Sequence, residues 1–219
     1  MRNLQKTVIG SKRRTTDLIN IADLLRYKDL FVQLTVRDIK IRYKQTLIGV
    51  AWVIFQPLLS MIIFTVIFGV LLKLPSGSLP YPLFVLTGLV FWNFFAISLT
   101  SASGSLAGNE SLVKKVYFPR IIVPLSTLAT NLFDFIISIF FLVLLIIIYR
   151  VTPNPFIFLV LPLSLILVLM TCLGLGLFLA ALNVKYRDVR QILPFFIQIL
   201  IFLTPVFYPV GLEIGRAHV

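Results

Sequence analysis

The sequence has one cysteine, Cys172, and one histidine, His218, among its 219 residues. A disulfide within the chain needs two cysteines, and metal sites in proteins are built from clusters of cysteine, histidine and carboxylate side chains. Acidic residues are also scarce, since eight aspartates and glutamates stand against 20 lysines and arginines. The composition therefore predicts no disulfide, no metal site and no catalytic residues, because an active site needs converging acids, a metal or an activated nucleophile.

Phosphate-binding motifs are missing as well. No segment has the form G-x-x-x-x-G-K-[ST], in which backbone amides and a lysine hold the phosphates of ATP. Gly174 and Gly176 do not form a dinucleotide-binding motif, because a third glycine, a preceding strand and a downstream acid are lacking. They predict a notch for helix packing. We expect no cofactor on this chain, so any use of ATP depends on another polypeptide.

Long apolar runs dominate the sequence, with 59% hydrophobic and 13% charged residues. Soluble domains are only about 45–50% apolar. A helix needs about 20 consecutive apolar residues to cross a bilayer. Stretches of this length or slightly less occur at 47–72, 81–106, 121–149, 156–183 and 193–208. The sequence predicts an all-α, polytopic transmembrane helix bundle with five spans.

Basic residues alternate between the two sides of this predicted bundle. Seventeen lysines and arginines fall in segments 1–46, 109–120 and 184–190, whereas segments 73–80 and 150–155 hold only Lys73 and Arg150. The positive-inside rule therefore places the N-terminus and the three basic segments in the cytoplasm. A net charge of +12 also occurs in nucleic-acid-binding proteins. Here its distribution makes the charge a topology signal, so no nucleic-acid partner is expected.

The N-terminal segment divides into two parts. Residues 1–19 are polar and have no periodicity, which indicates a tail. From residue 20 onward, apolar residues such as Leu24, Phe31 and Leu34 share one helical face, and charged residues occupy the other. This pattern predicts an amphipathic helix in the cytoplasmic interface. A lipid anchor and a docking surface for a partner protein both fit the pattern.

Three polar residues within the predicted spans, Gln56, Asn131 and Asp134, need partners inside the bundle. Gln56 precedes Pro57, which removes a backbone hydrogen bond and tends to kink a helix. Asp134 is the only acidic residue well inside a span. It is either a functional charge or a structural group that hydrogen-bonds to a neighbouring helix.

Four stretches of this sequence carry a resemblance to a known family. They are RYKQTLIGVAWVIFQPL at 42–58, VYFPRIIVP at 116–124, LNVKYRDV at 182–189 and TPVFYP at 204–209. In order and spacing, from about residue 20 to 212, the chain resembles the ABC-2 family of ABC exporter permeases. The similarity is greatest to the subunits that export polysaccharides of the O-antigen or teichoic acid type.

This resemblance implies a permease subunit with six spans and both termini in the cytoplasm of a bacterium, embedded in the inner membrane. It implies a homodimer that exports a lipid-linked polysaccharide and works with two separate ATP-binding-cassette subunits, which hold ATP and magnesium. In the family, the amphipathic helix and the segments 109–120 and 184–190 contact the ATPase. The charged residues at these places are Arg37, Asp38, Arg42, Glu110, Arg120, Arg187 and Asp188.

Aromatic side chains are candidates for the passage of a polysaccharide, because sugar rings pack their C–H faces on aromatic rings. Trp52, Phe55 and Trp92 lie within predicted spans, and Tyr81, Phe207 and Tyr208 lie nearer the outer surface. These six residues line or rim a passage, or they are simple interfacial anchors.

The predicted division of the chain has three parts. Residues 1–46 form the cytoplasmic tail and interfacial helix, and residues 47–212 form a truncated permease domain. The segment 213–219 breaks the pattern and matches the translation of a common sequencing adapter, so we expect it to be non-native and the natural chain to continue past Leu212.

The alternatives to a polysaccharide export permease are an ABC-2 exporter of drugs or small lipids, a membrane-embedded transferase acting on lipid-linked sugars, and a passive channel. The sequence has no motif for a selectivity filter, which argues against the passive channel.

Overall fold

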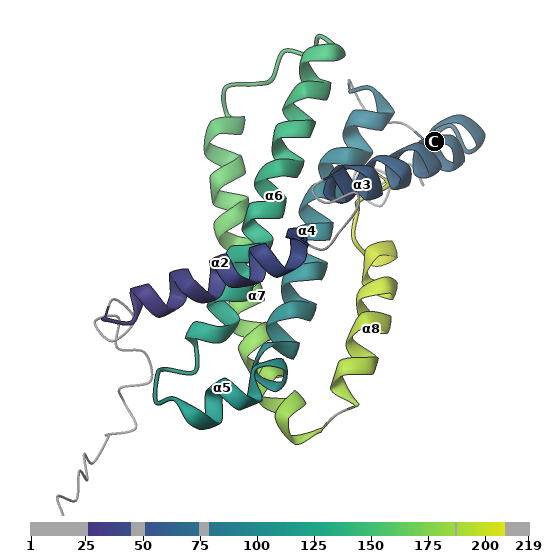
Figure 1. Cartoon of the computed structure of the whole chain (residues 1–219). Helices are drawn as coiled ribbons and strands as arrows, with labels where there is room; N and C mark the ends of the chain where they lie inside the picture. Colours follow the sequence, from purple (N-terminus) through teal and green to yellow (C-terminus); the bar gives the residue numbers. More distant parts are fainter. Residues whose placement is uncertain (1–25, 45–50, 75–78, 187, 209–219) are drawn as a thin grey trace, which may run out of the picture.

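The computed structural model describes residues 26–44, 51–74, 79–186 and 188–208, and all regular structure in these ranges is helical (Figure 1). The elements are α2 (Lys28–Lys44), α3 (Ala51–Phe64), the π-helix η1 (Thr65–Leu71), α4 (Tyr81–Gly108), α5 (Glu110–Lys115), α6 (Ile122–Ile148), α7 (Ile157–Lys185) and α8 (Val189–Leu203). The predicted all-α bundle is confirmed. The predicted tail 1–19, Arg187 and the segment 213–219 lie outside the described residues.

Four of the five predicted spans are present as long apolar helices. They are Ala51–Leu71, in which α3 continues into η1, together with α4, α6 and α7. Each has 21 to 29 residues. At about 1.5 Å per residue, each is long enough to cross a hydrocarbon core of about 30 Å. The chain is therefore a multi-pass membrane protein.

The fifth predicted span, 193–208, is only partly helical. α8 begins at Val189 and has 15 residues, so its length of about 22 Å falls short of the hydrocarbon core. It ends at Leu203 because Thr204 precedes Pro205 and takes an extended conformation (φ −91°, ψ 136°). The turn that follows reaches the far end of α4, where the Tyr81 hydroxyl donates to the Phe207 carbonyl at 2.6 Å. This segment thus traverses the bundle as a short helix and a turn.

α4 is the central helix of the bundle and the most buried span. Its N-terminal half packs on α6, where Leu86 and Phe94 meet Phe135 in one apolar cluster. Its C-terminal half packs on α7, where a Cβ atom on Gly176 would lie 2.7 Å from the Cβ of Ala102. The predicted packing notch is therefore confirmed at Gly176, whereas Gly174 has no neighbour within 4 Å.

The predicted amphipathic helix is confirmed as α2, which lies across the long helices (Figure 1). It packs mainly on α6. Leu34 is buried with Phe118, Ile122 and Val123 near the N-terminal end of α6. Other apolar side chains of α2, such as Ile41 at 64% exposure, point away from the protein. An apolar face that is free of protein contacts fits a helix that lies in lipid.

Candidate functional site

The end of α2 is joined to the middle of α6 by a polar cluster of four residues. Arg42 Nη1 forms an ion pair with one carboxylate oxygen of Asp134, and Arg42 Nη2 donates to Asn131 Oδ1 at 2.9 Å. The Tyr43 hydroxyl donates to the second carboxylate oxygen of Asp134. Asn131 and Asp134 are three residues apart, so they share one face of α6. We call Arg42, Tyr43, Asn131 and Asp134 the α2–α6 cluster.

The cluster explains how an acidic residue is accommodated inside a span. An unpaired carboxylate is costly at this depth, and a guanidinium with a phenol satisfies both of its oxygens. The Asp134 side chain is 15% exposed and that of Arg42 is 36% exposed. Burial of the Tyr43 hydroxyl, and then its hydrogen bond to Asp134, raise the pKa of Tyr43 above its ordinary range. Tyr43 therefore stays protonated and remains a donor at neutral pH.

The structure gives Arg42 and Asp134 partners that the sequence did not predict. Asp134 bonds to α2, which is separated from it by about 90 residues. These contacts are of the kind that the structural alternative for Asp134 predicts. Arg42 was expected at the ATPase contact, but its guanidinium turns toward α6 within the same chain.

A cavity of about 500 Å³ adjoins the α2–α6 cluster, between α2, α3, α4 and α6. Its walls are mostly apolar, and polar side chains come from each of the four helices. The three predicted intramembrane polar residues, Gln56, Asn131 and Asp134, all lie in its lining. The remaining lining residues are Arg42, Tyr43, Trp52, Val53, Pro57, Val90, Asn93, Phe94, Ile97, Phe135 and Ser138. The sequence interpretation omitted Asn93, although it is an amide in a span, as Gln56 is.

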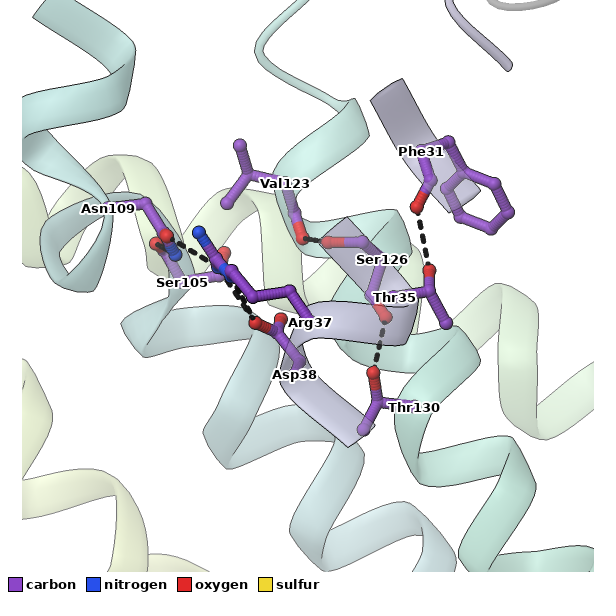
Figure 2. Close-up of polar contacts among 9 residues, drawn as sticks. All are labelled: Phe31, Thr35, Arg37, Asp38, Ser105, Asn109, Val123, Ser126 and Thr130. Atoms are coloured by element: carbon purple, nitrogen blue, oxygen red, sulfur yellow. Dashed lines mark hydrogen bonds and ion pairs between the residues drawn. The ribbon is translucent and has the colours of Figure 1, made fainter. Parts of the chain in front are cut away.

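A second polar contact ties α2 to the junction between α4 and α5 (Figure 2). Arg37 Nε and Nη2 donate to Asp38 Oδ1 at 2.9 and 2.7 Å, and Nη2 also donates to Asn109 Oδ1 at 2.9 Å. The Asn109 amide in turn donates to the Ser105 carbonyl at 3.0 Å. This chain of contacts fixes α2 against the C-terminal end of α4.

The α2–α6 contact also contains hydroxyl side chains that are satisfied locally. Thr35 donates to the Phe31 carbonyl, Ser126 to the Val123 carbonyl, and Thr130 to the Ser126 carbonyl, at 2.8 to 3.0 Å (Figure 2). Ser126 and Thr130 are each 1% exposed. Because each hydroxyl bonds to its own helix, α2 can pack on α6 without leaving these donors unsatisfied.

Three other residues predicted to contact an ATPase, Glu110, Arg120 and Asp188, lie at one end of the bundle, where Figure 1 shows α5 and the start of α8. Glu110 pairs with Lys114 one turn along α5 at 2.5 Å. Arg120 follows α5 and Asp188 precedes α8, and both are exposed. Arg187 lies outside the described residues. Tyr117, which the sequence interpretation did not select, is 82% exposed beside Arg120.

The six aromatic candidates for a passage fall into two groups. Trp52 and Phe55 are 52% and 47% exposed on α3, and Trp52 lines the cavity. Tyr81 and Phe207 are buried, and the Phe207 ring stacks on Phe64 with centroids 3.9 Å apart, so both residues hold the turn after α8. Trp92 and Tyr208 are half-buried.

Residues 29–212 match the ABC-2 type transporter family, and the chain belongs to this family of membrane permeases. Its relatives include an O-antigen export system permease protein from Klebsiella pneumoniae, which is 31% identical over 180 residues (82% of this chain and 69% of the relative). An O-antigen export system permease protein from Myxococcus xanthus is 30% identical over 191 residues (87% and 72%). Membership of the family implies a transport subunit with an ATP-binding-cassette partner.

Proposed function

We propose that the chain is the permease subunit of an ABC exporter that moves a lipid-linked polysaccharide, of the O-antigen type, out across the bacterial inner membrane. The observation that carries this proposal is the similarity to O-antigen export permeases over more than four fifths of the chain. The permease acts as a homodimer with its N-terminus in the cytoplasm. ATP and magnesium bind to the partner subunit, and this chain hydrolyses no ATP.

The two attachments of α2 support a role in energy coupling. Arg37 ties α2 to Asn109 at the start of α5, and Arg42 ties it to Asp134 in α6. A partner that closes on nucleotide and displaces α2 or α5 therefore moves α6 as well, because rigid elements transmit such shifts. The exposed residues Tyr117, Arg120 and Asp188 remain available for the partner's surface.

Deletion of the gene in its own host tests the proposal. We expect surface polysaccharide to disappear and lipid-linked polysaccharide to accumulate inside the cell, with both effects reversed by a plasmid copy. The matched control is a strain with an intact permease and an ATPase partner whose phosphate-binding lysine is replaced, and it should show the same defect. Unchanged surface polysaccharide in the deletion strain would refute the proposal. Unchanged polysaccharide with altered drug sensitivity would favour the exporter of drugs or small lipids.

A further inference from the structure

The cavity beside the α2–α6 cluster contains polar groups that the coupling role does not use. Asn131 is only 2% exposed, and its Oδ1 accepts from Arg42. Its Nδ2 is buried and has no hydrogen-bond partner within the described part of the chain. A buried amide without a partner is unfavourable, and native structures that retain one usually supply a partner from outside. Asn131 also belongs to the lining of the cavity.

Two further carboxamides lie in the same lining, Gln56 from α3 and Asn93 from α4. Neither side chain forms a hydrogen bond to another residue in the described ranges. The cavity thus collects three carboxamides from three helices against apolar walls that include Trp52 and Phe94. A volume of about 500 Å³ lies within the range of about 300–1,000 Å³ that small-molecule sites occupy.

The charges at this cavity select among ligand classes. Arg42 is already paired with Asp134, so the two charges cancel. A phosphate group would bring its negative charge close to the Asp134 carboxylate, and the described lining holds no second cation to offset it. Carboxamides both donate and accept hydrogen bonds, which suits hydroxyl groups. Aromatic walls suit the C–H faces of a sugar ring. The lining therefore favours a neutral, hydroxyl-rich ligand over a phosphate.

The position of the cavity indicates how such a ligand arrives. The cavity lies where the end of α2 meets the middle of two spans, since Asn93 and Asp134 are near the midpoints of α4 and α6. The middle of a membrane-spanning helix lies within the hydrocarbon core, so a ligand enters this cavity from the bilayer. A sugar carried on a lipid chain reaches it with the chain still in the bilayer.

We propose that this cavity binds a single sugar ring of a lipid-linked glycan, through the carboxamides of Gln56 and Asn93. The identity of the glycan rests on the proposed function, whereas the binding of a lipid-borne sugar does not. The site is thus a recognition site for the cargo before its export.

The binding test uses the protein in lipid nanodiscs without any ATPase. Trp52 lines the cavity and Trp92 does not, so Trp92→Phe leaves one reporter tryptophan. The probe is octyl glucoside below its micelle concentration, and free glucose and octyl phosphocholine are the comparison ligands. We expect a saturable change in Trp52 emission with octyl glucoside, at least tenfold weaker binding of glucose, and no saturable change with octyl phosphocholine.

Matched substitutions then locate the site. Gln56→Leu and Asn93→Leu should each weaken octyl glucoside binding at least fivefold, because each removes a hydrogen-bonding group from the lining. Gln198→Leu is the matched control, since Gln198 is exposed on α8 outside the cavity. Size-exclusion elution identical to that of the parent protein establishes that the variants are folded.

Three results would overturn the proposal: no saturable change with octyl glucoside, equal affinity of the Gln56→Leu and parent proteins, or saturable binding of octyl phosphocholine at the same site. Equal binding of free glucose would overturn the requirement for a lipid chain. The outcome is separate from that of the gene deletion. Sugar binding together with unchanged surface polysaccharide in the deletion strain would refute the export function and retain the site. Loss of surface polysaccharide without sugar binding would retain the export function and refute the site.

Discussion

Separating Arg42 from Asp134 tests the contact that joins the interfacial helix to the bundle. Asp134→Leu removes the carboxylate that both Arg42 and Tyr43 contact and leaves the Arg42 charge with the neutral Asn131 Oδ1, whereas Arg42→Leu removes the charge that offsets the Asp134 carboxylate. The double variant removes both charges, and an apolar pair in place of an ion pair is often close to neutral. The cost of the double variant should therefore be well below the sum of the two single costs.

The structure sets the magnitude of this difference. Breaking a fully buried ion pair costs about 3–5 kcal/mol, but Arg42 is 36% exposed and Asp134 is 15% exposed, so water screens part of the interaction. Hydrogen bonds between membrane helices contribute about 0.6 kcal/mol on average and at most about 1.7 kcal/mol. With two bonds to a charged acceptor, we expect a coupling energy of about 2 kcal/mol.

The coupling energy is measured as a double-mutant cycle, from the folded fraction of purified protein against the mole fraction of sodium dodecyl sulfate in mixed micelles. Asp134→Asn is the conservative control, because it keeps an acceptor for Arg42 and Tyr43 and should be less destabilising than Asp134→Leu. Additive single costs, within about 0.5 kcal/mol, would contradict the pairing.

Three other predictions follow from single contacts. Gly176→Leu forces a side chain against Ala102 and should lower stability by about 1–3 kcal/mol, whereas Gly174→Leu, which has open space, should lower it less, as measured in the same micelles. Tyr43→Phe should reduce the loss of stability between pH 9 and pH 11. The pKa of Tyr43 is raised in the folded state, so the stability that its protonated hydroxyl contributes is complete below the ordinary pKa of 10.0 and is lost as the pH rises further. An equal loss of stability in the variant and the parent protein would contradict this. In a Cys172→Ser background, an impermeant thiol reagent applied to intact cells should label Asn154→Cys and spare Ser111→Cys, and the reverse pattern would invert the topology.

The long spans could be predicted from the sequence because their signal is local. Apolar runs such as 121–149 have no competing structure in a bilayer, and α6 occupies almost the whole of that range. The end of the fifth stretch depends on a distant contact. Pro205 stops α8, and the hydroxyl of Tyr81, which is 126 residues from Phe207, satisfies the backbone of the turn. Hydropathy alone carries no information about that contact.

The polar cluster could likewise be predicted from the sequence only in part. The rule that intramembrane polar groups need partners selected Gln56, Asn131 and Asp134, and the structure brings all three to one cavity. The rule does not name the partners. Arg42 is one of eleven basic residues in segment 1–46, and only the packing of α2 on α6 distinguishes it from the others. The link from Arg37 to Asn109 is likewise tertiary, since 72 residues separate them.

The central claim is that this chain provides the membrane passage for an ATP-driven polysaccharide exporter. The most direct measurement uses inside-out membrane vesicles that contain the permease and its cassette ATPase, loaded on their outer face with radiolabelled lipid-linked polysaccharide. Protection of the label from an added glycosidase reports its arrival in the lumen. We expect protection that requires both ATP and this chain. Equal protection in vesicles that lack the chain, or protection that is independent of ATP, would contradict it.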